Sequence, residues 1–470
     1  MKVCLLNDSF PPIIDGVANV VMNYGRIMQS ELGAEVIVAT PRYPDTDYDC
    51  YPYKVIAYPS IDATKIVAGY RAGNPLAMKE IAQMSEFAPE IIHAHCPASS
   101  MFMARVLQNE TGAPIVFTYH TKFDVDIARA VGEGFLKKET VKAMVSNISA
   151  ADEVWVVSKG AGENLKSLGY EGDYRVVNNG VDFSRGCAEQ GFVKEVTKDY
   201  DLPADIPMFL FVGRLMKYKG LPIIVDAMKI LDEAGMDFRM VFVGDGADAD
   251  EMKTSVREKG LDKKIFFTGA IHDRETLRAW NTRADLFLFP SSYDTNGIVV
   301  REAAACGLAS VLIKDSCAAE GITPGHNGYV TDENAQAMAE LLKNVCTDMT
   351  RVHEVGNNAM NEIYISWEDS VKEAYKRYAE ISEMVKSGEM KRRKPHASDI
   401  VLETVAGVAE AGRKVFEIPA IFMEGMMDNV NELHEFGQQT KESIRQGLKK
   451  AGETIEAGVE NIKKLPIGKQ

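Results

Sequence analysis

The chain has 470 residues, and its 53 Lys and Arg stand against 68 Asp and Glu, which gives a formal net charge of −15. This length allows two or three domains, and the acidic balance argues against a general nucleic-acid binder, which is usually basic. With 46% hydrophobic and 26% charged residues the composition is that of a soluble globular protein, and no apolar run is long enough to span a membrane.

The cysteines and the N-terminal residues indicate the cellular compartment in which the protein is expected. Seven cysteines are scattered along the chain without a CxxC pair, a pattern that fits a reducing compartment. The N-terminal apolar run is too short for a signal peptide and predicts a first strand instead. We therefore expect a cytoplasmic protein.

Residues 1–181 alternate strand and helix patterns. Val17, Val20, Val21, Tyr24, Ile27 and Met28 recur at helical spacing and predict one helix face. This alternation predicts a doubly wound, Rossmann-like α/β domain with a parallel sheet. Short apolar runs typical of buried parallel strands occur at Val3–Leu6, Val36–Thr40, Ile91–His95, Ile115–Tyr119 and Val154–Val157.

A second domain of the same class is expected at residues 208–366, after a linker at 182–207 that contains Gly and Pro and has no strong period. Two such domains would leave a cleft at the carboxyl ends of their strands, where open α/β sheets bind ligands. The strand-like runs of this domain are Phe209–Val212, Met240–Val243, Ile265–Thr268, Leu286–Pro290 and Ser310–Ile313.

The C-terminal part changes in composition. Residues 367–390 predict a helix, whereas residues 391–470 begin with the basic run Lys391–Lys394 and form a glycine-rich tail. One narrow helical stripe in this tail could lie on a bilayer, pair with another helix or pack on the enzyme body. Glutamates among the lysines of its polar face weaken the lipid interpretation. The stripe consists of Ile444, Leu448, Ala451, Ile455, Val459 and Ile462.

The segment FVGRLMKYKG, which ends at Gly220, predicts an anion site. A strand ends before Gly213, and Arg214 and Lys219 follow it just before a helix that begins near Gly220. Two cations beside a helix N-terminus at the end of a strand suit a diphosphate. On spacing alone, two solvated surface cations fit equally well.

The segment FPSSYDTNGIVVREAAACG supplies acidic residues. Asp294, Gly297 and Glu302 follow a buried strand and precede a helix rich in small residues. Gly297 would let backbone approach a ligand, and Glu302 could accept two hydroxyl hydrogen bonds, as a ribose offers. Taken alone, the acids are better explained as residues of a helix N-terminus, where the macrodipole favours negative charge.

The two segments together resemble the family 4 retaining glycosyltransferases of the GT-B fold. The shared features are GR-x4-KG and, about 75 residues later, an acidic residue followed after seven residues by Glu before an Ala-rich helix. Five further segments resemble the family in order and spacing: FPPIIDGVANVV, PEIIHAHCP, PIVFTYHTKFD, VVNNGVD and FVGDGADADEM. The HxH and TYHT strand ends are similar to those of members that glycosylate lipids. The resemblance covers residues 1–385, and ISWEDSVKEAY within it resembles the helix that crosses back to the first domain.

The resemblance implies a role for each matching position. Arg214 and Lys219 would hold the donor diphosphate, Glu302 the nucleotide ribose, and Asp294 hydroxyl groups of the donor sugar. Backbone around Gly213 and Gly16 would approach the diphosphate, and His120 would sit beside the transferring sugar. The remaining donor positions are Asn296, Gly297 and Ile298, and the candidate acceptor positions are His93, His95 and Asp124.

Some positions depart from the family or have ordinary structural alternatives. The first acidic residue is Asp294 where the family usually has Glu, and Asn296 stands where it usually has Phe, which leaves the donor sugar open. We expect His93 and His95 to point to opposite faces of their strand, so that one faces the cleft. Each of them is at least as well explained as a structural histidine, and Asp124 is better explained as a loop cap.

The expected reaction follows from the resemblance. A hexose, with glucose from UDP-glucose as the first expectation and GDP-mannose as another donor, would move with retention to a membrane lipid such as diacylglycerol. Arg214 and Lys219 would stabilise the charge that grows on the leaving diphosphate. No cofactor and no metal ion is expected, because these cations would do the work of a metal.

Other functions stay open on the sequence. Within the class they are mannosyl transfer to phosphatidylinositol and transfer to a polysaccharide. In other classes they are a nucleotide-sugar epimerase, which would need no acceptor, and a non-catalytic scaffold. We expect no nucleic-acid partner, and a membrane surface on the cytoplasmic side or a helix partner is the expectation for the tail.

Overall fold

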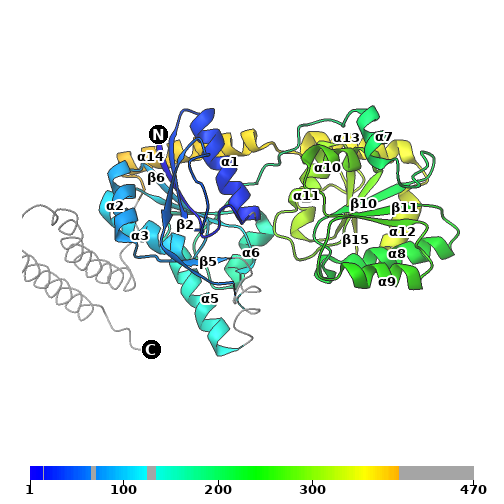
Figure 1. Cartoon of the computed structure of the whole chain (residues 1–470), viewed down its shortest axis with the longest axis horizontal. Helices are drawn as coiled ribbons and strands as arrows, with labels where there is room; N and C mark the ends of the chain where they lie inside the picture. Colours follow the sequence, from blue (N-terminus) through cyan, green and yellow to red (C-terminus); the bar gives the residue numbers. More distant parts are fainter. Residues whose placement is uncertain (14, 65–69, 124–126, 128–133, 391–470) are drawn as a thin grey trace, which may run out of the picture.

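The computed structural model describes residues 1–13, 15–64, 70–123, 127 and 134–390. Two α/β lobes lie side by side (Figure 1), each with a parallel sheet between helices, which confirms the predicted fold class. The tail and Asp124 lie outside the described residues. Among the described residues, no helix is both long and apolar enough to span a membrane.

The N-terminal lobe has a seven-stranded sheet in the order β3-β2-β1-β6-β7-β8-β9, in which all neighbouring strands are parallel. Its strands are β1 (Lys2–Leu6), β2 (Glu35–Pro41), β3 (Lys54–Tyr58), β6 (Ile91–Ala94), β7 (Ile115–Tyr119), β8 (Glu153–Val156) and β9 (Arg175–Val176). Its helices are α1 (Gly16–Ser30), α2 (Met78–Phe87), α3 (Ser99–Thr111), α5 (Phe135–Ile148) and α6 (Lys159–Ser167). An antiparallel pair, β4 (Ser60–Asp62) and β5 (Arg71–Gly73), lies beside the sheet.

The C-terminal lobe has a six-stranded parallel sheet in the order β12-β11-β10-β13-β14-β15. Its strands are β10 (Met208–Val212), β11 (Arg239–Val243), β12 (Ile265–Gly269), β13 (Leu286–Phe289), β14 (Ala309–Ile313) and β15 (Tyr329–Thr331). Its helices are α7 (Gln190–Thr197), α8 (Leu221–Glu233), α9 (Ala249–Glu258), α10 (Arg274–Arg283), α11 (Ile298–Ala305), α12 (Ala335–Val345) and α13 (Met349–Glu362), with short 3₁₀ turns at η1 (Lys217–Lys219) and η2 (Cys317–Ala319).

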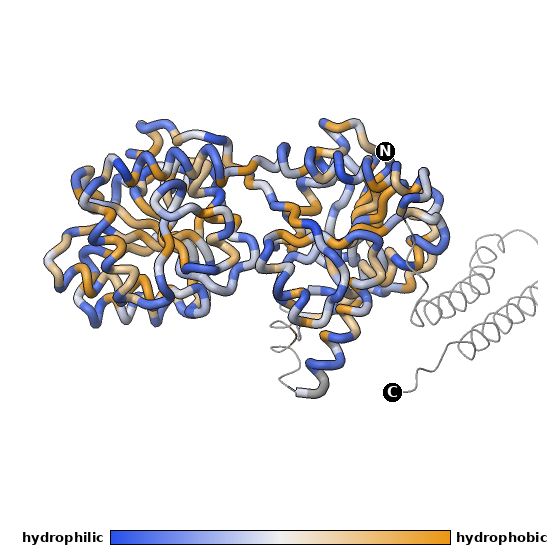
Figure 2. The backbone as a smooth tube through the Cα atoms, turned by 180° about the vertical axis from the view of Figure 1, so that it is seen from behind, coloured by the Kyte–Doolittle hydropathy of each residue, from blue (hydrophilic) through white to orange (hydrophobic). Residues whose placement is uncertain are grey.

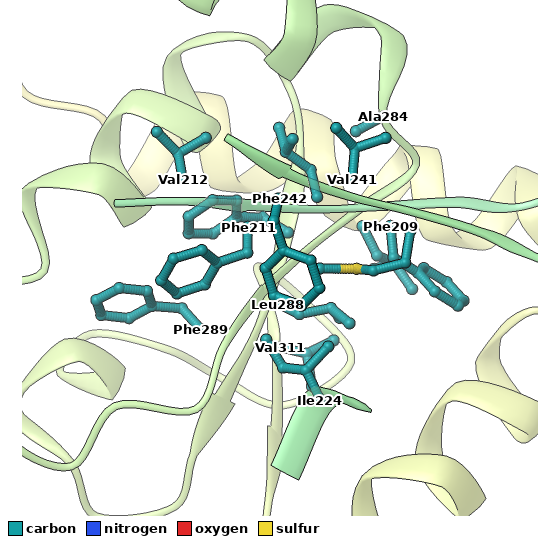
Figure 3. Close-up of a cluster of buried hydrophobic side chains, with 14 of the residues drawn as sticks. Phe209, Phe211, Val212, Ile224, Val241, Phe242, Ala284, Leu288, Phe289 and Val311 are labelled. Atoms are coloured by element: carbon teal, nitrogen blue, oxygen red, sulfur yellow. The ribbon is translucent and has the colours of Figure 1, made fainter. Parts of the chain in front are cut away.

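The core of the C-terminal lobe is aromatic. The strands are hydrophobic in each lobe (Figure 2), and Figure 3 shows phenylalanine side chains of β10, β11 and β13 gathered at the centre of one. The rings of Phe211 and Phe289 lie 6.0 Å apart and nearly parallel, and Phe242 lies 5.9 Å from Phe211. These packed rings fix the ends of β10 and β13, the two strands from which the candidate site is built.

Helix α14 (Trp367–Ser387) follows the C-terminal lobe in sequence but packs on the N-terminal lobe (Figure 1). Tyr378 stacks on Trp155 of β8 with ring centroids 5.3 Å apart. Arg377 binds the Glu153 carboxylate through Nε at 3.0 Å and Nη2 at 2.5 Å. The buried aromatic pair and the forked ion pair fasten the end of the C-terminal half to the N-terminal sheet.

Two differences from the sequence prediction concern short elements. Residues 182–207, predicted as a linker, contain helix α7, which packs against α10. Strands β9 and β15 have only two and three residues, too few for a hydrophobic period to show. The domain limits themselves remain predictions.

Gly220 generates a prediction about stability. Its φ is +76°, and an added Cβ would lie 2.2 Å from the Pro290 carbonyl oxygen. Gly220→Ala should therefore lower the free energy of unfolding by about 2 kcal/mol or more, from backbone strain plus the clash. Gly235→Ala is the matched control, since its φ is +75° with open space around it, and should cost about 1 kcal/mol. Thermal unfolding of both variants measures the difference, and equal losses would contradict the clash.

Candidate functional site

The candidate site lies where the order of the C-terminal sheet reverses. Strand β10 lies between β11 and β13. The segment after β10 carries Gly213, Arg214 and Lys219, and the segment after β13 carries Asp294 and, in helix α11, Glu302. Open α/β sheets bind ligands at the carboxyl ends of strands at such a switch point. The topology therefore brings together two motifs that lie about 75 residues apart in the sequence.

Lys219 and Asp294 form the central ion pair of the site. The Lys219 ammonium lies 2.9 Å from both carboxylate oxygens of Asp294. Ser291 donates a hydrogen bond of 2.6 Å to Asp294 Oδ2, and the ammonium lies 5.4 Å from the centroid of the Phe289 ring. Lys219 is only 9% exposed, so its charge is held by the carboxylate and the aromatic ring rather than by bulk water.

Arg214 has a different environment. Its side chain is exposed and donates to the Tyr218 hydroxyl at 3.3 Å. Gly213, one residue earlier, donates a backbone hydrogen bond to Val243 at the end of β11. The site thus combines a pre-positioned buried ammonium with a guanidinium on the surface.

Glu302 of α11 is buried and paired. Its Oε1 accepts a hydrogen bond of 2.5 Å from Arg274 at the start of α10. Burial raises the pKa of Glu302, and the Arg274 charge offsets part of that rise. Arg274 itself stacks 4.5 Å from the Phe183 ring centroid. Arg274 could not be found from the sequence, because no local pattern connects it with Glu302, which lies 28 residues later.

The loop before α11 is restrained by close packing at Gly297 and by hydrogen bonds from Arg301. Gly297 adopts φ +60°, and an added Cβ would lie 3.1 Å from Ala318. Asn296 accepts a hydrogen bond of 3.1 Å from Arg301. Arg301 also binds the segment that joins the lobes, through the Asn178 side chain at 2.9 Å and the Asn179 carbonyl at 3.0 Å. Burial lowers the pKa of Arg301 to about 10, so this arginine still carries its charge at neutral pH.

Polar contacts cross between the lobes at this same loop. The Thr295 hydroxyl donates to the His120 carbonyl at 2.7 Å, and the Thr295 carbonyl accepts from Ser158 at 2.5 Å. Close by, Glu320 accepts from the backbone N–H groups of Lys159 and Gly160 at the N-terminus of α6. A carboxylate at a helix N-terminus is favoured by the unpaired N–H groups and the macrodipole. The candidate donor loop therefore touches the N-terminal lobe directly.

The histidines do not lie as predicted. The rings of His93 and His95 are 3.9 Å apart, so the expectation that they point to opposite faces is wrong. Residues i and i+2 of a strand share a face, and only neighbours alternate. His93 is fully buried between the hydroxyls of Tyr378 and Thr118, and His95 contacts His120 at 3.0 Å. His93 is thus a satisfied core histidine and is not exposed to an acceptor.

Burial also decides the charge of these rings. It lowers the pKa of His93 and His95 well below the usual value and that of His120 to about 3. All three imidazoles are therefore neutral at neutral pH.

Gly16 is the first residue of α1, and the space around it is open. Within the described ranges, no three His, Cys, Asp or Glu side chains are grouped as a metal site.

Comparison with protein families identifies the class. A model described as Glycosyltransferase Family 4 matches residues 14–185, and one described as Glycosyl transferases group 1 matches residues 193–362. The solved structure of HepE from Anabaena in complex with UDP superposes with a TM-score of 0.64 at 18% identity, over 81% of this chain and all of that one. The fold is therefore GT-B, the two-lobed fold of glycosyltransferases. The chain belongs to glycosyltransferase family 4, as the sequence motifs predicted.

Three relatives show the range of the family. A sulfoquinovosyl transferase of Arabidopsis thaliana is 29% identical over 64% of this chain, but the match spans only 57% of that protein. An alpha-monoglucosyldiacylglycerol synthase of Acholeplasma laidlawii is 22% identical over 73% of this chain and 87% of its own length. A GDP-mannose-dependent phosphatidylinositol dimannoside mannosyltransferase of Mycobacterium tuberculosis is 25% identical over 59% of this chain and 70% of its own.

The Glu302–Arg274 pair predicts a pH-dependent loss of stability. Arg274→Met removes the cation, so the pKa of the buried Glu302 should rise further and its ionised form should become more costly. The variant should therefore be least stable relative to the parent at high pH. The difference should shrink as the pH falls through the raised pKa of Glu302, because the protonated acid needs no cation.

Urea unfolding of the parent and Arg274→Met between pH 5 and pH 8 measures this trend. The double variant Arg274→Met/Glu302→Gln is the control, since a neutral amide cannot titrate and the trend should vanish. A stability difference that stays constant with pH would show that Glu302 does not depend on Arg274.

Proposed function

We propose that this protein is a retaining glycosyltransferase that moves a hexose from a nucleotide-diphosphate sugar to a hydroxyl group of a membrane lipid. Glucose from UDP-glucose and diacylglycerol are our first choice of donor and acceptor. The relative named for monoglucosyldiacylglycerol and the structural neighbour that holds UDP support this choice. The HxH and TYHT strand ends support the lipid class of acceptor.

The observation that carries the proposal is the Lys219–Asp294 pair, whose lysine lies on the same segment after β10 as Arg214. A diphosphate at the carboxyl end of β10 would find a buried ammonium whose position is already fixed at 2.9 Å from a carboxylate. The ammonium needs little reorganisation to receive an anion, and this pre-organisation is what stabilises growing charge most effectively. Asp294 would then accept hydrogen bonds from hydroxyl groups of the donor sugar, and Glu302 would accept hydrogen bonds from the ribose hydroxyl groups.

The proposed step keeps the configuration of the sugar. The bond between the anomeric carbon and the phosphate oxygen breaks, and the acceptor oxygen bonds to the same face of that carbon. The acceptor proton passes to the departing phosphate. Arg214 and Lys219 stabilise the negative charge on the leaving diphosphate, which is the stabilisation that a metal cation supplies in other transferases. We propose that this enzyme needs no metal ion.

A second candidate is mannosyl transfer from GDP-mannose to a phosphatidylinositol lipid. The mycobacterial relative supports it. The two candidates share the diphosphate and lipid chemistry and differ in the base and the sugar. Asp294 and Asn296, which depart from the usual family residues, leave the sugar open between them.

We also propose that the protein works in the cytoplasm and binds the membrane surface peripherally. The support is indirect: a lipid acceptor has to be reached at a surface, and the tail begins with four consecutive basic residues, Lys391–Lys394. Basic segments are attracted to anionic lipid by about 1 kcal/mol per residue near the surface.

Release of nucleotide tests the function. UDP-glucose and GDP-mannose are each incubated with the full-length protein, with and without vesicles that contain diacylglycerol or phosphatidylinositol. We expect release of UDP that depends on diacylglycerol and persists in excess chelator. Turnover of donor without any acceptor would point to an epimerase or hydrolase, and a strict need for Mg²⁺ would contradict the metal-free step.

Removal of either cation should lower turnover. Arg214→Ala and Lys219→Ala should each reduce kcat by roughly 10²-fold or more, because one lost charge contact to the leaving group costs about 3 kcal/mol. Lys217→Ala is the control: this exposed lysine lies between them in sequence but pairs with Glu251 at 2.6 Å. Steady-state kinetics of the three variants test the assignment, and near-normal kcat for Arg214→Ala and Lys219→Ala would refute it.

Truncation after Met390 should separate catalysis from surface binding. The shortened chain keeps every described residue of the site, so turnover of a soluble acceptor analogue should be nearly unchanged. Turnover of acceptor in vesicles should fall, because the basic run Lys391–Lys394 and the helical stripe are lost. Co-sedimentation with anionic and neutral vesicles measures the binding. Equal binding by both forms would contradict a membrane role for the tail.

A further inference from the structure

The His120 ring contacts a second histidine, His95, through one of its ring nitrogens. His120 follows β7, and its Nε2 lies 3.0 Å from Nδ1 of His95, which follows β6. The two rings are inclined by only 21° with centroids 5.3 Å apart. Among the described residues, no hydrogen bond engages the other ring nitrogen of His120, Nδ1.

His95 is itself fixed by packing. Its ring lies against His93 at 3.9 Å and meets the edge of Tyr24 at 5.8 Å and 86°. His93 is in turn fixed by the hydroxyls of Thr118 and Tyr378. Tyr378 belongs to α14, so the helix that crosses back to the N-terminal lobe contacts this histidine cluster through His93.

One proton lies between the two facing nitrogens, and its position decides which nitrogen of His120 can donate. His95 Nε2 is buried and has no hydrogen-bond partner. If His120 supplied the shared proton, the neutral His95 ring would carry its own N–H on Nε2, and that N–H would be buried without an acceptor. A buried N–H without an acceptor forfeits its hydrogen bond outright, and among backbone groups such unpaired donors are rarer than under-satisfied acceptors. The other arrangement leaves only a lone pair unpaired.

We propose that His95 is a positioning residue that donates from Nδ1 to His120 Nε2 and thereby holds His120 in the Nδ1–H tautomer. His120 then has a fixed N–H donor on its free side, aimed by its ring contact with His95 and by the Thr295 contact to its carbonyl group. A neutral donor of this kind suits an uncharged oxygen of the transferred sugar. This inference rests on the proposed function for its consequence in catalysis, but the tautomer itself does not.

Nitrogen NMR tests the tautomer directly. The protein labelled with ¹⁵N-histidine contains eight histidines, and the spectrum of His120→Asn assigns the His120 signals by difference. Two-bond ¹⁵N–¹H correlations distinguish a protonated Nδ1 from a protonated Nε2. We expect His120 to carry its proton on Nδ1, and a proton on Nε2 would overturn the proposal whether or not any turnover has been found.

Two substitutions of His95 test its role in catalysis. His95→Phe keeps a ring but cannot donate. It should lower kcat by about 10- to 100-fold, the range known for partners that orient metal-binding histidines, with little change in KM for the donor. His95→Asn places an amide N–H near the position of Nδ1 and should recover most of that loss. Recovery by Asn would not occur if His95 only filled space.

Thr118→Val is the matched control, because it removes a buried hydrogen bond from the same cluster without touching His120. Its kcat should stay within about two-fold of the parent. Normal kcat for His95→Phe, or equal losses in His95→Phe and Thr118→Val, would overturn the positioning role. Failure of every variant and of the parent to transfer sugar would count against the proposed function, while the tautomer measurement would still stand.

Discussion

The ion pair between Lys219 and Asp294 is the interaction on which the C-terminal half of the site depends. It joins the loop after β10 to the loop after β13 across the switch point of the sheet, and the Phe289 ring lies beneath the ammonium. The Lys219 side chain is 11% exposed and that of Asp294 26%, so loss of the carboxylate would leave the Lys219 charge largely buried without its partner, at a cost of about 3–5 kcal/mol. The pair therefore fixes a cation at the place where we propose that a diphosphate binds.

The loop that carries Asp294 also joins the two lobes. Thr295, the next residue, binds both the His120 carbonyl group and Ser158, while Arg301 reaches the segment between the lobes. A change in the angle between the lobes would alter these contacts and the position of Asp294 together. The contacts thus tie the position of the loop that carries Asp294 to the position of the N-terminal lobe.

The fold class and the family could be predicted because both are encoded locally. Buried parallel strands are continuous apolar runs, and the glycines and charges after them stand at fixed intervals, so each predicted run lies within one or two residues of an observed strand. Strand β3, which is only partly buried, was not predicted. Partners that meet only through the topology could not be found this way. Arg274 lies on the helix before β13 and Glu302 on the helix after it, and no period in the sequence joins them.

The same limit explains the histidines. Their residue types and spacing were visible, but the contact between His95 and His120 needs two neighbouring strands in a particular register, in which His93 pairs with Val116 and Ala94 with Phe117. Helix α7 was missed for a different reason. Its eight residues form a two-turn helix whose buried face consists of Val193 and Thr197, which is too little to distinguish from a loop by pattern.

The charges of the site are divided between the lobes in a way that bears on the route of the acceptor proton. The C-terminal lobe supplies Arg214, Lys219 and Glu302, whereas the N-terminal lobe presents His120, a neutral ring whose pKa is lowered by burial to about 3. A phosphate monoester, by contrast, has a second pKa of about 6. The imidazole is therefore the weaker base of the two, which favours the departing phosphate as the acceptor of the proton in the proposed transfer. In that proposed step His120 acts as a hydrogen-bond donor.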